Sequence, residues 1–353
     1  MMRRTVVCAF LVACVAFLGT IADAGTPAQA PVASQPGIFK LGTSQAGELD
    51  KSSAQHLAVH VKNAVEAQTG GALKVQIYPG NQLGGEREVI ESIRLGSVEM
   101  ACLSEGAVPG FFPPIQVLSQ PYFFRNEAVA WKVLDGPFGQ YLSEAMRQKT
   151  GIRVLGFGEN GMRNFTNSVR PIRKPEDLKG LKMRTMETPA HMEMMKALGA
   201  GPVPVPAPET YTAMQQKMVD GQENPLTVIN FFRYDEVQKY AILDGHIYSP
   251  HVIMVNDRWF KGLPPAQQVI LQDAVNIGKY VARGALQNLI AQAYNDLTKR
   301  GMQIYTPTAE EKEAFRKASQ GRVREWIVKN VGQEWVDRLD AALKEAEKEL
   351  AVK

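Results

Sequence analysis

An arginine just before a helix start is the residue whose type and place point most directly to chemistry. Arg184 lies in a strand-like segment, residues 181–186, and Thr188-Pro189 then supplies an N-cap and a first-turn proline. Ligands of open α/β sheets bind at such strand ends. A guanidinium presents a planar fork that matches a carboxylate with two parallel hydrogen bonds. Arg184 is therefore a candidate carboxylate anchor, and the alternative is a solvated charge or an internal salt bridge. Arg163 has the same two interpretations.

Two other motifs, for dinucleotide binding and for metal binding, are incomplete in this sequence. Residues 156–161 satisfy G-x-G-x-x-G after a strand, but residues 163–169 look extended, so no helix N-terminus meets a pyrophosphate. A glycine-rich hinge fits this run better. His56 and His60 are four residues apart without a glutamate between them or a third ligand, which favours a solvated helix face. The sequence therefore indicates no catalytic residue, no metal and no cofactor.

The N-terminus has the order of a secretory signal. Basic Arg3 and Arg4 precede an uncharged apolar run, residues 6–21, and Ala-Asp-Ala at residues 22–24 is a small-x-small cleavage site. We expect export to the periplasm. The N-terminal part then divides into a signal peptide, residues 1–24, and a disordered lead-in rich in Pro, Ala, Gly and Gln, residues 25–37.

The composition is that of a globular protein with about two domains. The chain has 353 residues, 22% charged and 45% hydrophobic, with a net charge of +4 spread along its length. Without a dense basic run, nucleic-acid binding has no electrostatic footprint. Cys102 is the one cysteine outside the signal, so no intrachain disulfide is expected, and it fits a small buried apolar residue.

Strands alternate with helices along the chain, which predicts an α/β fold. Expected strands lie at residues 38–42, 73–78, 98–103, 152–157 and 181–186, and expected helices at residues 48–68, 86–95 and 188–198.

Residues 265–300 carry a helical pattern without internal proline, roughly 50 Å long if straight. Such a helix belongs either to two lobes or to the surface of one domain. The expected apolar face contains Val269, Val275, Val281, Leu286, Ile290 and Leu297.

Several motifs together resemble one known family, the solute-binding proteins of TRAP transporters (the dicarboxylate-binding, DctP-type family). The resemblance covers nearly all of the mature chain. Its most specific part is the Asp-Gly-Gln-Glu-Asn-Pro run at residues 220–225, together with the spacing between this run and Arg184. The matching segments are residues 78–79, 82–87, 94–96, 161–167, 170–172, 176–184, 209–211 and 219–225.

The resemblance implies a two-lobed periplasmic-binding-protein fold (type II-like) with hinge strands and a long helix shared by both lobes. It implies that a small organic acid binds between the lobes, and that the protein, a monomer, docks on a TRAP permease driven by an ion gradient. The expected lobe I comprises residues 38–160 plus about 250–290, and the expected lobe II comprises residues 161–249 plus about 291–353.

The resemblance also implies roles for single residues. The arginine matching Arg184 forms a bidentate salt bridge to the ligand carboxylate, that matching Arg163 is a second anion contact, and the asparagine matching Asn224 bonds the same region. Further residues fall at or beside cleft positions by alignment: Ser44, Glu86, Ser104, Glu105, Glu187, Tyr211 and His251.

One departure concerns the pocket's size. Many family members place a bulky aromatic where this chain has Ala207. Either the pocket is roomier, or another aromatic such as Phe231 or Phe232 fills it.

Two other functions remain as alternatives. A periplasmic enzyme acting on a carboxylate would need a nucleophile–base pair or a cofactor loop. A ligand-dependent partner of a sensor kinase would share the same cleft.

Overall fold

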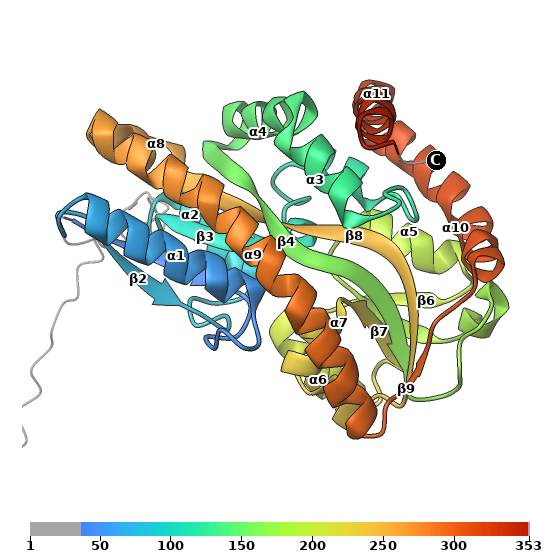
Figure 1. Ribbon diagram of the computed structural model, residues 1–353. Helices are drawn as coiled ribbons and strands as arrows, with labels where there is room; N and C mark the ends of the chain where they lie inside the picture. The colour runs from blue at the N-terminus through green and yellow to red at the C-terminus, as the bar shows by residue number, and fades with distance from the viewer. Residues whose placement is uncertain (1–36, 352–353) are drawn as a thin grey trace, which may run out of the picture. The chain divides into compact units, whose positions relative to one another are not determined.

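The computed structural model describes residues 37–351 (Figure 1). The predicted signal peptide and nearly all of the lead-in therefore lie outside the described residues. The described part is a mixed α/β structure, which confirms the expected fold class. Its strands are β1 (Ile38–Thr43), β2 (Lys74–Tyr78), β3 (Met100–Ser104), β4 (Ile152–Asn167), β5 (Lys182–Thr185), β6 (Gly201–Pro204), β7 (Gly221–Asn224), β8 (Tyr240–Asn256) and β9 (Gln303–Tyr305).

Helices connect and follow these strands. Ser52 caps the first helix by accepting the Gln55 N–H, so that helix begins at Ser53 and the expected start at residue 48 is wrong. The helices are α1 (Ser53–Gln68), α2 (Glu86–Leu95), α3 (Glu127–Asp135), α4 (Pro137–Thr150), α5 (Pro189–Ala197), α6 (Thr210–Gln215), α7 (Leu226–Phe231), α8 (Asp257–Gly262), α9 (Pro265–Lys299), α10 (Ala309–Asn330) and α11 (Gln333–Glu349).

The sheet contains two parallel groups joined by two long antiparallel strands. One group is β2-β1-β3, the other is β7-β5-β6, and β8 and β4 lie between them in the order β2-β1-β3-β8-β4-β7-β5-β6. Figure 1 shows β4 and β8 running side by side between the groups. The carboxyl ends of two parallel groups are where an α/β sheet binds ligands.

Three bulges interrupt the pairing of β4 with β8, between Val154 and Gly156, Glu159 and Gly161, and Arg163 and Phe165. The glycine-rich run at residues 156–161 lies inside this strand, and no helix follows it. Gly161 has a φ of +115°, which a side chain would strain. The run therefore bends a strand, which agrees with a hinge and not with a dinucleotide loop.

Helix α9 contributes to two separate hydrophobic cores. Leu271, Ala274 and Val275 pack with α1 and β1, whereas Ala293 and Leu297 pack with α7 and the residues around β7. The interpretation of a helix shared by both halves is therefore confirmed.

The expected apolar face of α9 was only partly right. Val269 and Val281 are exposed, because the buried stripe follows small and charged residues that a valine-and-leucine pattern overlooks, among them Gly278, Lys279 and Arg283. Cys102 is buried in β3, as expected.

Gly221 gives a test of how tightly β7 is packed. A Cβ there would lie 2.2 Å from the Thr166 carbonyl oxygen and 2.8 Å from Met183 Sδ. We expect Gly221→Ala to lower the free energy of unfolding by about 1–3 kcal/mol, measured by urea denaturation. The control is Gly284→Ala on α9, where nothing lies within 4 Å. That change should raise stability by up to about 1 kcal/mol, and an equal loss in both variants would contradict the packing argument.

Candidate functional site

A small cavity with polar and apolar lining residues lies where the carboxyl ends of the two parallel groups face each other. It encloses about 30 Å³. A wider groove of about 600 Å³ adjoins it and shares Glu86, Arg184, Met186 and Ala207 with it. The cavity and groove together are called the cleft below. The cavity is lined by Ser44, Gln45, Glu86, Ser104, Asn160, Arg184, Met186, Ala207, Asn224, Val228, Phe232 and Tyr234.

Arg184 enters the cavity from β5. Its side chain is 2% exposed, and its Nε donates to the Val205 carbonyl at 2.8 Å. Among the described residues no carboxylate forms a salt bridge with it, and neither Nη has a hydrogen-bond partner. Burial lowers the pKa of this guanidinium, because it penalises the charged form. The fork is therefore fixed at Nε and free at its two Nη atoms, as binding a carboxylate requires.

Arg163, in contrast, is paired with a carboxylate inside the protein. It is 0% exposed, and both its Nε and Nη2 donate to the Glu223 carboxylate, the latter at 2.9 Å. Nη2 also donates to Asn224 Oδ1 at 3.1 Å. Arg163 is not among the residues that line the cavity. Its recorded contacts are therefore those of a group that holds Asn224 in place from behind.

The Arg163–Glu223 pair continues into a buried chain of polar groups. His246 Nε2 lies 3.2 Å from Glu223 Oε2, and His246 Nδ1 lies 2.9 Å from Asp244 Oδ2. Burial opposes ionisation of Glu223, but Arg163 and the adjacent histidines outweigh it and hold its pKa well below the usual range. Burial likewise opposes protonation of His246, but Asp244 and Glu223 raise its pKa. Phe165 stacks on the His246 ring at 3.9 Å, which fixes the ring plane.

The residues expected from the sequence fall into three groups. Five of them line the cavity: Arg184, Asn224, Glu86, Ser44 and Ser104. Glu187 lines the adjoining groove, where its carboxylate pairs with Arg87 at 2.9 Å. Their contact with a ligand stays a prediction.

Four expected residues line neither the cavity nor the groove. One is Arg163, described above, and the other three are Tyr211, Glu105 and His251. Tyr211 donates to Glu236 at 2.8 Å on an exposed part of the surface. Glu105 is buried and accepts from the Ser249 hydroxyl at 2.6 Å. His251 is buried in β8 opposite Ser104, and burial lowers its pKa to about 4. Glu105 follows the lining residue Ser104 in the chain and His251 lies opposite it in the sheet. A contact of these residues with a ligand stays a prediction.

Several lining residues were not expected from the sequence. Gln45 and Asn160 bond to each other at 2.9 Å across the cavity's edge, and a pattern of motifs gives no signal for either. Of the two aromatic alternatives opposite Ala207, Phe232 lines the cavity and Phe231 does not. Phe232 stacks on Tyr234 with 5.6 Å between ring centroids. This aromatic pair could have been found only through the departure at Ala207.

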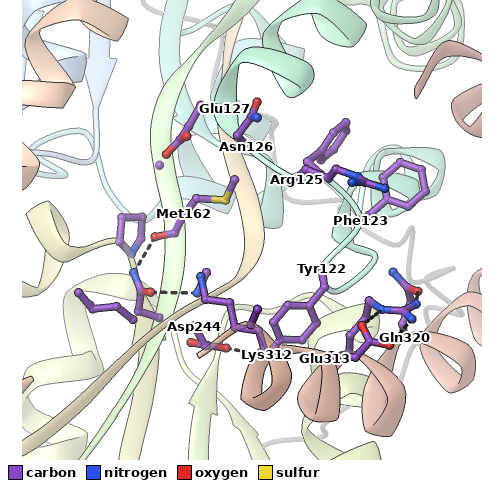
Figure 2. A pocket seen from close by; sticks show the side chains of 18 of the residues that line it. Tyr122, Phe123, Arg125, Asn126, Glu127, Met162, Asp244, Lys312, Glu313 and Gln320 are labelled. Atoms are coloured by element: carbon purple, nitrogen blue, oxygen red, sulfur yellow. Dashed lines mark hydrogen bonds and ion pairs between the residues drawn. The ribbon is translucent and has the colours of Figure 1, made fainter. Parts of the chain in front are cut away.

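A second, larger groove lies elsewhere and contains none of the expected residues. It encloses about 1200 Å³ and is lined by residues 122–127, parts of β4 and β8, α10 and α11. Figure 2 shows Tyr122 and Asp244 turned toward each other, with Lys312, Glu313 and Gln320 of α10 beside them. The Tyr122 hydroxyl donates to Asp244 at 2.7 Å. The buried chain from Arg163 thus ends at the floor of this groove.

Two further features of the described residues concern metal binding and membrane spanning. No group of three or more His, Cys, Asp or Glu side chains there is arranged to hold a metal ion. None of the helices described there combines the length and hydrophobicity of a membrane span.

Comparison with known proteins gives consistent matches. The family model described as bacterial extracellular solute-binding protein, family 7 (DctP) matches residues 46–330. A solute-binding protein of Verminephrobacter eiseniae is 43% identical over 68% of this chain and 71% of its own length. The 2,3-diketo-L-gulonate-binding periplasmic protein YiaO of Escherichia coli is 33% identical over 81% of this chain and 87% of its own.

A solved structure agrees with these matches. The TRAP periplasmic solute-binding protein of Polaromonas sp. JS666, bound to D-erythronate, has a TM-score of 0.81 and 36% identity. The alignment covers 87% of this chain and 98% of that one. The mixed sheet and helices of the described residues therefore have the two-lobed architecture of that protein class.

The Arg163–Glu223 pair should matter for stability because both groups are 0% exposed. We expect Glu223→Ala to lower the free energy of unfolding by about 3–5 kcal/mol, since it leaves a buried guanidinium unpaired. Urea denaturation measures this. The control is Glu334→Ala, which removes an exposed pair with Arg338 and should change stability little. A small effect of both changes would contradict the buried-pair argument.

Glu105 should make stability depend on pH. Burial raises its pKa to about 7, with Arg163 partly opposing. The folded state then holds a proton that the unfolded state loses above about pH 4.5, so stability falls as pH rises from 4.5 to 7. Replacement by Gln removes this loss. We measure the free energy of unfolding of Glu105→Gln and of the wild type by urea denaturation between pH 5 and pH 8. As the pH rises over this range, we expect the variant to gain up to about 3 kcal/mol of this free energy relative to the wild type. If the difference in unfolding free energy between the variant and the wild type did not change with pH, the raised pKa of Glu105 would be contradicted.

Proposed function

The chain belongs to the bacterial extracellular solute-binding proteins of family 7, and from this membership we propose that it captures a small organic carboxylate between two lobes and delivers it to an ion-gradient-driven TRAP permease. Members of this family are binding proteins, and its TRAP members are periplasmic. The ligands named for relatives are organic acids, namely 2,3-diketo-L-gulonate and D-erythronate. They support the same ligand class here.

The observation that carries the proposal is the unpaired guanidinium of Arg184. Its Nε is held by Val205, and its two Nη atoms have no partner among the described residues. Burying such a group without a counter-charge is costly, and a ligand carboxylate removes that cost. Micromolar affinity requires only about 8 kcal/mol of binding free energy, which one such pair and several hydrogen bonds supply.

We propose that the remaining cavity residues hold the rest of the ligand. Asn224, Glu86, Ser44 and Ser104 supply hydrogen bonds, and Arg163 acts through Asn224. Since most of the cavity residues are buried, the proposal includes a separation of the two halves that admits the organic acid. The bulged strands β4 and β8 supply the hinge for this motion.

The same proposal covers the protein's place and partners. It is exported by a cleavable signal to the periplasm, acts as a monomer without a cofactor, and releases its ligand unchanged. Its partners are the ligand and the membrane subunits of the permease. If incubation of the protein with an acid that it binds yielded a new product, release of an unchanged ligand would be contradicted and the enzyme alternative would be favoured.

Arg184→Ala tests the anchor. We expect it to leave the thermal unfolding temperature close to that of the wild type and to weaken carboxylate binding by at least about 30-fold, because a desolvated charge pair loses one partner. The probe is the acid that gives the largest thermal shift in a carboxylate library, and isothermal titration calorimetry measures its affinity.

The control for this change is Arg94→Ala. Arg94 is an exposed guanidinium on α2 that pairs with Glu91, and its loss should leave affinity unchanged. Unaltered affinity in Arg184→Ala would remove the basis of the proposed function.

A further inference from the structure

Several strand ends meet at the edge of the sheet that faces away from the cavity. Strands β5, β7, β8 and β9 begin there, and β4 ends there. Figure 1 shows the ends of β4 and β8 close to β9. Arg184 and Asn224, which line the cavity, lie at or near the opposite ends of β5 and β7. This edge and the loops that leave it are therefore separate from the candidate ligand site.

Cations are concentrated at this edge. Residues 167–182, 217–221 and 239–240 contain seven lysines and arginines but three acidic residues. Their net charge of +4 equals that of the entire 353-residue chain, so the rest of the chain is neutral overall. The seven cations are called the basic edge below: Arg170, Arg173, Lys174, Lys179, Lys182, Lys217 and Lys239.

The fold gathers a charge that is spread along the sequence. The Lys239 N–H donates to the Asn167 carbonyl at 3.1 Å, and the Asp220 N–H donates to the Lys182 carbonyl at 2.7 Å. Arg170 donates to the Lys179 carbonyl at 2.6 Å. Backbone contacts of this kind join the three stretches, so their cations share one part of the surface.

These cations are unpaired and face water. None of the seven forms a salt bridge among the described residues. Six are exposed, and Arg170 is half-buried. Two of the three acidic residues instead serve the backbone. Asp177 Oδ2 accepts two N–H groups, at 2.9 and 3.1 Å, and Asp220 Oδ2 accepts the Lys182 N–H at 2.8 Å. The basic edge therefore attracts anions from outside the protein.

Two apolar side chains accompany these charges. Val169 and Met218 are 49% and 58% exposed. The Ser168 N–H donates to the Asp220 carbonyl at 3.0 Å, which ties their two loops together. Cations with exposed apolar side chains among them are typical of surfaces that bind the interface of an anionic membrane.

The types of cation favour a lipid surface over a protein partner. Five of the seven are lysines, whose ammonium is a point charge on a flexible stem, whereas arginine makes planar paired contacts. Protein interfaces are enriched in arginine and depleted in lysine. A fluid layer of lipid phosphates requires no fixed geometry, and each Lys or Arg near it strengthens binding about five-fold.

We propose that the basic edge is a peripheral membrane-binding surface that holds the protein on anionic phospholipid headgroups. The cations supply the attraction to lipid phosphates, and Val169 and Met218 supply a shallow apolar contact. Because the cavity lies at the other ends of β5 and β7, the membrane-bound protein still binds its ligand. Such binding keeps the loaded protein close to membrane subunits. It uses a different surface from the proposed function and is tested separately.

Vesicle co-sedimentation tests this surface. The probes are vesicles of phosphatidylcholine alone and of phosphatidylcholine mixed equally with anionic phosphatidylglycerol. The protein without residues 1–24 should bind the mixed vesicles and not the neutral ones at about 0.1 M salt. Binding should weaken at least about 10-fold at about 1 M salt, where the Debye length falls from about 10 Å to about 3 Å.

An edge variant removes part of the charge. It carries Lys179→Gln, Lys182→Gln and Lys217→Gln, three exposed positions whose side chains form no salt bridge among the described residues. Its partition onto the mixed vesicles should fall at least about 20-fold, because three charges that contribute about five-fold each are lost. Its thermal unfolding temperature and its carboxylate affinity, measured by isothermal titration calorimetry, should equal those of the wild type.

A control variant removes the same net charge elsewhere. It carries Lys149→Gln, Lys329→Gln and Lys344→Gln, at exposed positions of α4, α10 and α11. Its partition onto the mixed vesicles should change less than about three-fold, since charges more than a Debye length from the lipid are screened.

Three results would overturn the membrane proposal. One is no binding to the mixed vesicles at the lower salt. Another is an equal loss of binding in the two variants, which would assign the effect to overall charge. The third is binding to permease subunits embedded in phosphatidylcholine that the edge variant loses, without binding to the mixed vesicles, which would assign the edge to an acidic protein surface. Absence of carboxylate binding would refute the proposed function alone.

Discussion

A buried guanidinium that forms no salt bridge with any carboxylate of the described residues is the constraint around which the cleft is arranged. Arg184 is desolvated by its position in β5 and is held at one nitrogen by the Val205 carbonyl. Arg163 is just as deeply buried, but Glu223 balances its charge. Two arginines of equal burial thus have different roles, decided by their partners. The paired arginine stabilises the fold. Burial of the unpaired arginine has a free-energy cost, which an anion from outside the protein removes when it binds.

The sheet topology explains how residues far apart in sequence reach this guanidinium. Parallel strands place their carboxyl ends at one edge, and this chain has two parallel groups whose edges meet at the cavity. Ser44 and Ser104 come from the first group, and Arg184 and Asn224 from the second. The antiparallel β4 and β8 join the groups, and their bulges give the local bending that separation of the two halves needs.

Much of the fold and about half of the candidate site could be predicted from the sequence. Glycine stops and strand alternation gave most elements of the first half, and the family motifs gave Arg184, Asn224 and Glu86. The missed residues depend on tertiary packing. The expected Glu105 directly follows β3, but the chain turns there into a short 3-10 helix and its carboxylate accepts the Ser249 hydroxyl without lining the cavity. Gln45 and Asn160 meet across 115 positions of sequence, a separation that no local pattern reports.

The pairing of Arg163 also changes what its neighbours contribute. Because its Nη2 donates to Asn224 Oδ1 as well as to Glu223, the Asn224 amide is oriented before any ligand arrives. His246 and Asp244 extend this chain to the floor of the groove beside Tyr122. Each member bonds to the next, so removing one leaves a buried charge or donor without that partner. The cleft therefore combines a wall braced by the Arg163–Glu223 pair with the guanidinium of Arg184, whose two Nη atoms have no partner among the described residues. Arg184 is thus where we expect the carboxylate of a ligand to lie.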